Sequence, residues 1–206
     1  MFELGVVEAA QGSCRFNSGG TVVLATAEGP MHDSERAASQ DPARGGLEVR
    51  VSLGNRGGSD RVVVERRLEE ELTAVLRNAV DLDAFPRELA RVTVLVVVDG
   101  GAAATAALNA AVLALLDARL PLASVPLAVD ATAAAAAAAR DDADTDGAAP
   151  PSPTTFTVAM DATSDDSAFL SLDTAGEPFD AAALASAVAN ARVRVDALRT
   201  AALAAS

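Results

Sequence analysis

A glycine-rich turn at Asp99-Gly100-Gly101 is the feature of this sequence best placed to bind an anion. It joins the apolar run "VVV" to an Ala-rich segment with a composition typical of a helix. Turns of this kind hold phosphate in many proteins, because the N–H groups at a helix N-terminus point outward and carry partial positive charge. The next positions, Ala102, Ala103 and Ala104, supply neither charge nor hydroxyl. An exposed helix end contributes only about 0.3–1 kcal/mol to anion binding, so the residues of the turn leave open whether it holds a phosphate or has kept only the shape of such a site.

Four arginines gather where a loop leads into an amphipathic helix, and they are candidates for RNA contact: Arg56, Arg61, Arg66 and Arg67. Four glutamates are interleaved with them: Glu65, Glu69, Glu70 and Glu71. Side chains three or four residues apart on a helix form ion pairs, each worth only tenths of a kcal/mol. The pattern therefore leaves two interpretations, an RNA-facing surface or a solvated helix with local ion pairs, and it favours the second.

An acidic run, "DDADTDG", resembles the start of a calcium-binding loop, with Asp142, Asp144, Asp146 and Gly147 at the first, third, fifth and sixth positions. Pro153 stands at the twelfth position, where such a loop needs a bidentate glutamate. We interpret the run as a solvated acidic loop and predict no metal site and no cofactor. Weak recruitment of Mg²⁺ by these aspartates, for hydrolysis, is the enzymatic alternative.

The single histidine and the single cysteine also fit ordinary structure better than catalysis. His32 stands in the polar loop "MHDSERAAS", and its sequence neighbours do not make a catalytic triad, whose members are usually distant in sequence. Cys14 stands in a short strand without a nearby histidine. We expect a surface histidine and a half-buried packing cysteine.

Composition excludes several classes of function. A net charge of −13 argues against nucleic-acid binding by bulk electrostatics, so an RNA contact would need a local arginine patch or a partner chain. One cysteine excludes an internal disulfide and fits a reducing compartment. No apolar run reaches transmembrane length, and the N-terminus lacks a basic region followed by an apolar core. We therefore expect neither a membrane span nor a signal peptide.

Hydrophobic periodicity predicts the elements that carry these residues. Residues 47–53 alternate apolar and polar side chains, which predicts a half-buried strand. Residues 61–80 predict an amphipathic helix that Pro86 ends. The run 91–98, nearly continuous in β-branched residues, predicts a central strand buried on both faces. The expected inner stripe of the helix is Val64, Leu68, Leu72, Val75, Leu76 and Ala79.

Other elements follow from the same patterns. Two β-rich runs around "NSGG" at 17–20 predict a hairpin, and strands are also predicted within 122–129, 154–160 and 167–172. The inner residues expected for the helix after Gly101 are Leu108, Val112, Leu115 and Leu116, and those for a last helix at 179–206 are Leu184, Val188, Val195 and Leu198. This order predicts a two-layer α+β fold with helices against one side of a mixed sheet. We expect a single domain over 1–206, with a low-complexity Ala/Asp/Pro-rich loop at about 131–153.

Several segments, in order, resemble RNase PH-type domains. "GSCRFNSGGTVVLATAEGP" looks like their opening hairpin, and "FPREL", an apolar strand, "DGG" and "LNAAVLALLDARLPL" continue the likeness. The likeness covers nearly the whole chain except the Ala/Asp-rich loop. Among the branches of the family, the chain looks most like the small, degenerate RNase PH-like subunits of the eukaryotic RNA exosome ring. The resemblance implies an RNase PH-like fold.

The resemblance also implies lost chemistry. Active members degrade RNA from its 3′ end with phosphate as nucleophile, which requires a cationic cradle and nearby carboxylates. In those members Thr-Arg-Thr follows the Gly-Gly turn, where this chain has Ala102 to Ala104. Their two catalytic aspartates correspond to Ala149 and Thr155. The resemblance therefore implies a subunit that is not an enzyme.

The same resemblance implies an architectural role in RNA processing and degradation. The expected partners are other RNase PH-like exosome subunits and cap subunits in a hetero-oligomeric ring, with RNA in the assembled channel and no membrane. The implied locations are the nucleus and nucleolus, and also the cytoplasm. Two alternatives stay open: a residual nuclease acting as a homodimer, and a plain structural domain without an RNA role.

Overall fold

The computed structural model describes residues 1–32, 43–54, 60–132, 155–161, 163, 169–175, 185, 188–197 and 200. The chain divides into two compact units, Met1–Leu127 and Ala128–Ser206. The single domain expected over 1–206 stays a prediction. Most of the low-complexity loop expected at 131–153 lies outside the described residues, but 131 and 132 belong to a strand.

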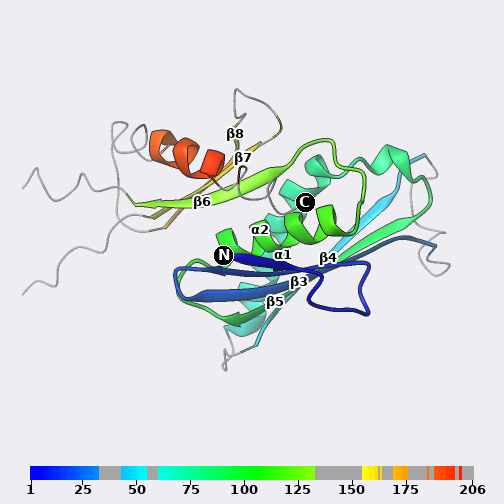
Figure 1. Ribbon diagram of the computed structural model, residues 1–206, viewed down its shortest axis with the longest axis horizontal. Coiled ribbons are helices and arrows are strands. Elements are labelled where there is room, and N and C mark those ends of the chain that lie inside the picture. Colours follow the sequence, from blue (N-terminus) through cyan, green and yellow to red (C-terminus); the bar gives the residue numbers. More distant parts are fainter. Residues whose placement is uncertain are drawn as a thin grey trace, which may run out of the picture. The chain divides into compact units, whose positions relative to one another are not determined.

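The first unit contains a five-stranded mixed sheet (Figure 1). Its strands run in the order β1 (Phe2–Leu4), β2 (Gly12–Ser18), β3 (Thr21–Met31), β5 (Leu89–Val98) and β4 (Gly46–Leu53). Each neighbouring pair is antiparallel except β4 and β5, which are parallel. The mixed sheet expected from the sequence is confirmed, and β1 is a strand that the sequence did not indicate.

The predicted hairpin is formed by β2 and β3 around Gly19 and Gly20. Ser18 pairs with Thr21, so the loop between the strands has only two residues. Both glycines have positive φ, +57° and +82°, as a tight hairpin turn between right-twisted strands requires. The glycines thus place Thr21 at the first position of β3.

The predicted amphipathic helix is α1 (Arg61–Ala79). The centre of the expected stripe is buried, and its flanks at Val64 and Val75 are half-buried. The expectation that Pro86 ends the helix is wrong. The backbone leaves the helical region at Val80, with ψ of 131°, and a 3-10 turn, η1 (Leu82–Ala84), comes before the proline. The buried residues of the stripe are Leu68, Leu72, Leu76 and Ala79.

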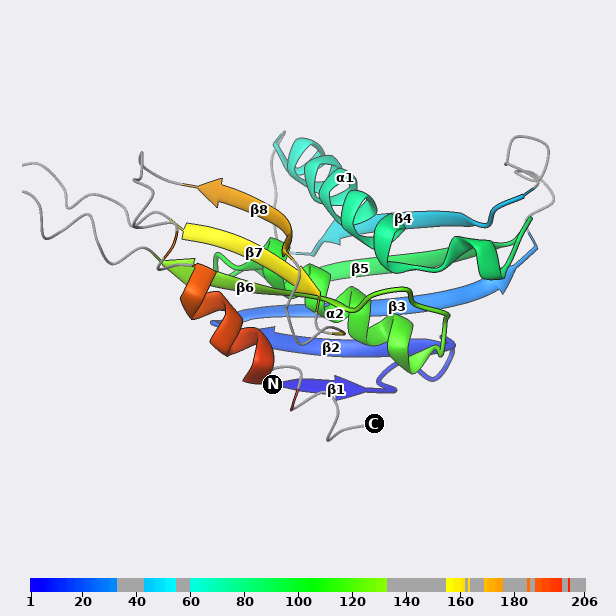
Figure 2. The ribbon, with the colours of Figure 1, turned by 90° about the horizontal axis from the view of Figure 1, so that it is seen from above.

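The Ala-rich helix after the glycine turn is α2 (Ala103–Asp117). Every residue from Thr105 to Leu115 is buried, whereas Leu116, expected on the inner face, is 40% exposed. Small alanine side chains let this helix approach the sheet closely. Figure 2 shows α1 and α2 on the same face of the five-stranded sheet, α1 against β4 and α2 against β2, β3 and β5.

Strand β5 is buried on one face only, so the expectation of burial on both faces is wrong. Val92, Val94 and Val96 face the helices and are buried, whereas Thr93 and Val97 on the other face are exposed. An antiparallel or mixed sheet with helices on one face leaves the opposite face to solvent.

A separate three-stranded sheet is formed by β6 (Pro126–Thr132), β7 (Thr155–Asp161) and β8 (Phe169–Ala175), and all of it except the first two residues of β6 belongs to the second unit. Strands β7 and β8 are antiparallel. Residues 188–197 are helical, with Ala191 and Val195 buried and Val188 half-buried. The other two expected inner residues, Leu184 and Leu198, lie outside the described residues. The strands predicted after α2 therefore form a second sheet.

Cys14 lies on β2 and is fully buried, more deeply than the half-buried position expected. Burial, together with the negative charge of Asp117, raises the pKa of the Cys14 thiol to about 12. Because the thiolate is the reactive form, we expect the folded chain to react with 5,5′-dithiobis(2-nitrobenzoate) at pH 8 at least about 100-fold more slowly than the urea-unfolded chain. Equal rates would mean that β2 separates from α2 without global unfolding.

Candidate phosphate-binding turn and its surroundings

The glycine-rich turn between β5 and α2 has the strand–turn–helix geometry predicted for it. Its backbone is held by two side-chain oxygens. The Thr21 hydroxyl accepts hydrogen bonds from the N–H groups of Gly100 (2.9 Å) and Ala102 (3.3 Å). The Asp99 carboxylate accepts from the N–H group of Gly101 (2.9 Å), whose φ is +97°. These bonds fix the turn in a conformation that glycine at 101 adopts readily.

Gly100 brings this turn into direct backbone contact with the β2–β3 hairpin. A Cβ atom at Gly100 would lie 2.8 Å from the carbonyl oxygen of Gly19 and 3.0 Å from the amide nitrogen of Thr21. The two turns therefore pack backbone against backbone, and only glycine fits at position 100. Thr21 was not identifiable from the sequence, because its contact with the turn joins residues 79 positions apart.

The side chains that follow the turn offer nothing to an anion. Ala102, Ala103 and Ala104 are half-buried methyl groups, and no side chain caps the N-terminus of α2. Within the described residues, no three histidine, cysteine or acidic side chains are placed to hold a metal ion. The turn and the three alanines after it therefore offer an anion main-chain N–H groups and no side-chain ligand. The absence of phosphate binding stays a prediction.

The two positions expected to replace the catalytic aspartates belong to the second half of the chain. Thr155 begins β7, in the second unit. Ala149 and the acidic run at 141–147 lie outside the described residues. The correspondence of Ala149 and Thr155 with catalytic positions therefore stays a prediction.

Three of the four candidate RNA-contacting arginines lie at the start of α1 and form ion pairs with glutamates four residues later. The pairs are Arg61–Glu65 (2.8 Å), Arg66–Glu70 (3.3 Å) and Arg67–Glu71 (2.7 Å). This is the geometry of the second interpretation, a solvated helix with local ion pairs. Contact with RNA stays a prediction, and Arg56 lies outside the described residues.

Glu65 has a second role besides its pair with Arg61. Its carboxylate accepts a hydrogen bond from the backbone N–H group of Leu53 on β4 (2.8 Å). This bond and the hydrogen bond from Arg61 hold the pKa of the Glu65 carboxyl below its ordinary range. Glu69 likewise accepts from the N–H group of Val51 (2.9 Å). The sequence alone indicates these glutamates only as partners of arginines.

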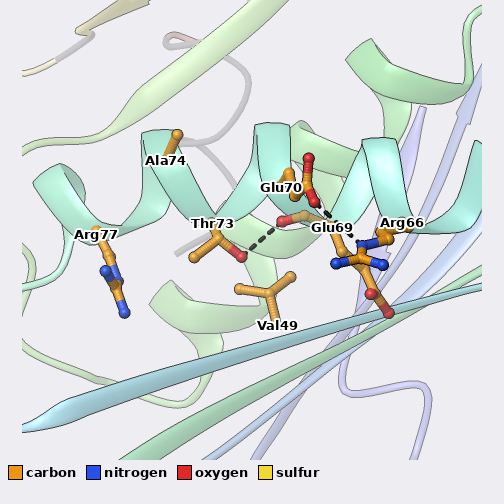
Figure 3. A pocket seen from close by; sticks show the side chains of 7 residues that line it. All are labelled: Val49, Arg66, Glu69, Glu70, Thr73, Ala74 and Arg77. Carbon is orange, nitrogen blue, oxygen red and sulfur yellow. Dashed lines mark hydrogen bonds and ion pairs between the residues drawn. The ribbon is translucent and has the colours of Figure 1, made fainter.

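A groove of about 450 Å³ opens beside this contact, between β4 and the part of α1 from Arg66 to Arg77. Figure 3 shows Thr73 and Arg77 directed from the helix toward the strand, and Val49 directed from the strand toward the helix. No local sequence pattern predicts this groove. The lining residues are Val49, Arg66, Glu69, Glu70, Thr73, Ala74 and Arg77.

His32 is exposed, as expected. In the described part of the chain, no helix combines the length and the apolar character that crossing a membrane requires.

Comparison with known sequences places these features in a family. The 3′ exoribonuclease family, domain 1, which is the RNase PH family, matches residues 1–121. The human exosome complex component MTR3 is 34% identical over 133 residues, which cover 55% of this chain and 47% of that protein. The fission yeast exosome complex component rrp46 is 27% identical over 177 residues, which cover 85% of this chain and 76% of that protein. The chain thus matches about half the length of the human relative.

Solved structures share the fold. Rice Rrp46 superposes with a TM-score of 0.74 at 19% identity, covering 97% of this chain and 93% of that chain. An archaeal exosome core subunit superposes with a TM-score of 0.70 at 17% identity, covering 98% of this chain and 85% of that chain. These likenesses confirm the RNase PH-like α+β fold expected from the sequence.

Proposed function

The chain belongs to the 3′ exoribonuclease family of RNase PH-type proteins, and we propose that it is a non-catalytic subunit of an RNA exosome core ring. Two observations support the exosome assignment. The similar sequences include exosome complex components from human, fission yeast and budding yeast. The similarity to the fission yeast component extends over most of both chains.

The observation that carries the non-catalytic part of the proposal is the turn between β5 and α2. Phosphorolysis brings a phosphate anion to an anionic phosphodiester, so the site must supply positive charge. The turn supplies main-chain N–H groups, of which those at Gly100, Gly101 and Ala102 already bond to Thr21 and Asp99. Half-buried alanines follow the turn. The proposed subunit keeps the fold that positions a phosphate and lacks the side chains that would bind it.

In the proposed role the chain organises a ring. It pairs with other RNase PH-like subunits, supports the cap subunits and forms part of the wall of the channel through which RNA passes. The net charge of −13 favours less acidic neighbours over a second copy of the chain, because two copies would bring like charge together. We propose the nucleus, nucleolus and cytoplasm as its locations, since RNA is processed and degraded in all three.

Native mass spectrometry of the complex purified through a tag on the full chain tests the assembly. We expect a multi-subunit complex with one copy of this chain and several different RNase PH-like chains. A homodimer as the only assembly would contradict the ring. The isolated chain is then incubated with labelled single-stranded RNA, with and without phosphate and Mg²⁺. Release of nucleoside diphosphates or monophosphates above a buffer control would contradict the non-catalytic assignment.

Restoring the missing cation alone should not restore activity. We expect Ala103→Arg to yield no phosphorolysis, because the site would still lack a carboxylate partner. The substitution should change the free energy of unfolding by less than about 1 kcal/mol, since arginine is a good helix former and position 103 is half-buried in the first turn of α2. Diphosphate release is measured by thin-layer chromatography, with Ala103→Gln as an uncharged control of similar size. Activity in the arginine variant alone would show that a carboxylate already serves the turn.

A further inference from the structure

Within the part of the chain that the structure describes, the edge of β4 that faces away from β5 is covered at both ends and open in the middle. Strand β4 is the last strand of the five-stranded sheet. The N–H groups of Gly46 and Gly54 donate to the carbonyl oxygens of Glu88 and Val96, on the β5 side, at 2.8 Å each. Because N–H groups alternate in direction along a strand, those of the odd-numbered residues 47 to 53 point away from β5.

Two of these outward N–H groups are covered by carboxylates from α1. Leu53 donates to Glu65 (2.8 Å) and Val51 donates to Glu69 (2.9 Å). The spacings match because four residues of helix advance about 6 Å and two residues of strand advance about 6.6 Å. Glu65 and Glu69 of α1 therefore form a row of carboxylates along the strand edge, which we call the carboxylate ladder. At the other end of β4, the N–H group of Gly45 donates to the carbonyl oxygen of Leu82 (2.8 Å).

At the next position of the carboxylate ladder, opposite Val49, the helix has no carboxylate. Four residues after Glu69 the helix presents Thr73, and two residues before Val51 the strand presents Val49. The Thr73 hydroxyl donates to the carbonyl oxygen of Glu69 (2.6 Å), so it is turned toward its own helix. The groove lies at this step, with Val49 and Thr73 both in its lining (Figure 3).

Arg77 places a positive charge in the groove, where it could pair with a carboxylate bound beside Val49. It is exposed on the last turn of α1 and lines the groove. Among the described residues it has no ion pair, whereas Arg66, at the other end of the groove, is paired with Glu70. The two acidic side chains of the lining are engaged, Glu69 with Val51 and Glu70 with Arg66.

We propose that this groove binds an Asp or Glu side chain carried on an extended segment of a partner polypeptide. The carboxylate of the partner lies between Val49 and Thr73, where α1 has no carboxylate of its own. There it accepts a hydrogen bond from the N–H group of Val49 and forms an ion pair with Arg77. The backbone of the segment pairs with the open edge at Leu47, as an added strand does, because the carboxylate already takes the N–H group of Val49. The lining has two arginines and two glutamates and therefore no net charge. Because an RNA phosphate backbone binds to surfaces of net positive charge, this lining favours a polypeptide over RNA. The site does not depend on the proposed exosome role.

Two capped pentapeptides probe the groove, acetyl-Thr-Val-Asp-Val-Thr-amide and the same peptide with Asn in place of Asp. Each is titrated into the ¹⁵N-labelled full chain, and amide chemical shifts are followed by NMR. We expect the Asp peptide to shift the amide signals of Leu47 and Val49, and to bind at least about fivefold more tightly than the Asn peptide, because the ion pair with Arg77 is lost in the latter. Arg77→Gln should abolish this preference. Arg15→Gln, the same charge change on β2, should keep it.

A substitution that completes the ladder within the chain separates this site from unspecific peptide binding. Thr73→Glu should place a carboxylate opposite Val49, slow hydrogen exchange of the Val49 amide and prevent binding of the Asp peptide. Asn78→Glu, which adds the same charge to an exposed position of α1, should do neither.

Three results would overturn the proposal. One is the absence of amide chemical-shift changes at Leu47 and Val49 with either peptide. Another is an affinity that is the same for the Asp and Asn peptides and is unchanged by Arg77→Gln. The third is a Val49 amide as protected from exchange in the free chain as that of Val51, because a segment of this chain would then already cover the edge.

Discussion

Gly12→Ala is expected to lower the free energy of unfolding by about 3 kcal/mol or more, because the added methyl group has no room between β2 and α2. A Cβ atom at Gly12 would lie 2.2 Å from the amide nitrogen of Ala118 and 2.4 Å from the carbonyl oxygen of Ala114. Both are backbone atoms, so no rotation of a side chain relieves the contact. The helix would have to move away from the sheet and expose core residues around it. Urea denaturation followed by circular dichroism measures the loss.

Gly5→Ala is the matched control. Gly5 has a φ of +66°, but no atom lies within 4 Å of the position its Cβ would take. Its replacement should therefore cost only the strain of a left-handed alanine, about 1–2 kcal/mol. If Gly12→Ala cost no more than Gly5→Ala, the contact between β2 and α2 would be looser than the backbone distances indicate.

Elements with a strong local pattern were predictable from the sequence. Strand β4 alternates apolar and polar residues, and the alternation matches its burial. The central residues of α1 repeat at intervals of three and four, and that spacing alone identifies the face that packs on the sheet. The β2–β3 hairpin was predictable from two adjacent glycines between β-rich runs. In each case the information lies within a few residues of the element itself.

Features decided by distant parts of the chain were not predictable. A run of β-branched residues such as that in β5 is the same whether helices cover one face of the sheet or both. In the structure, helices cover one face. The end of α1 at Ala79 is set by pairing of Val80 with Leu122, not by the proline six residues later. The division of the strands between two sheets likewise depends on pairing that no local pattern records.

The candidate site was predictable in part for the same reason. The turn from Asp99 to Ala104 is contiguous, so its residue types indicated both a phosphate-site shape and missing ligands. Thr21 and the ladder of Glu65 and Glu69 act on residues that lie elsewhere in the sequence. In the sequence Glu65 is a helical partner of Arg61, and only the structure shows that the same carboxylate also covers a strand edge.

Thr21→Val is expected to lower the free energy of unfolding by about 2–3 kcal/mol, because it removes the acceptor for two N–H groups without changing the shape of the side chain. Thr21 is fully buried, and its hydroxyl is the acceptor for Gly100 and Ala102. Those two N–H groups would lose their partner where the backbone of the hairpin lies directly against the turn. Hydrogen exchange at Gly100 and Ala102 should become faster, while the amides in the middle of β3 keep their protection. Urea denaturation and exchange measured by NMR provide both readouts.

Thr26→Val on the same strand provides the comparison. Thr26 is half-buried on the outer face, and within the described residues its hydroxyl has no hydrogen bond, so its replacement should change stability by less than about 0.5 kcal/mol. The difference between the two variants isolates the role of the hydroxyl from the change in β-propensity. If Thr21→Val cost no more than Thr26→Val, the turn would hold its shape without Thr21. The packing of Gly100 on the hairpin and the hydrogen bond from Gly101 to Asp99 would then be sufficient to hold the backbone of the turn in its observed conformation.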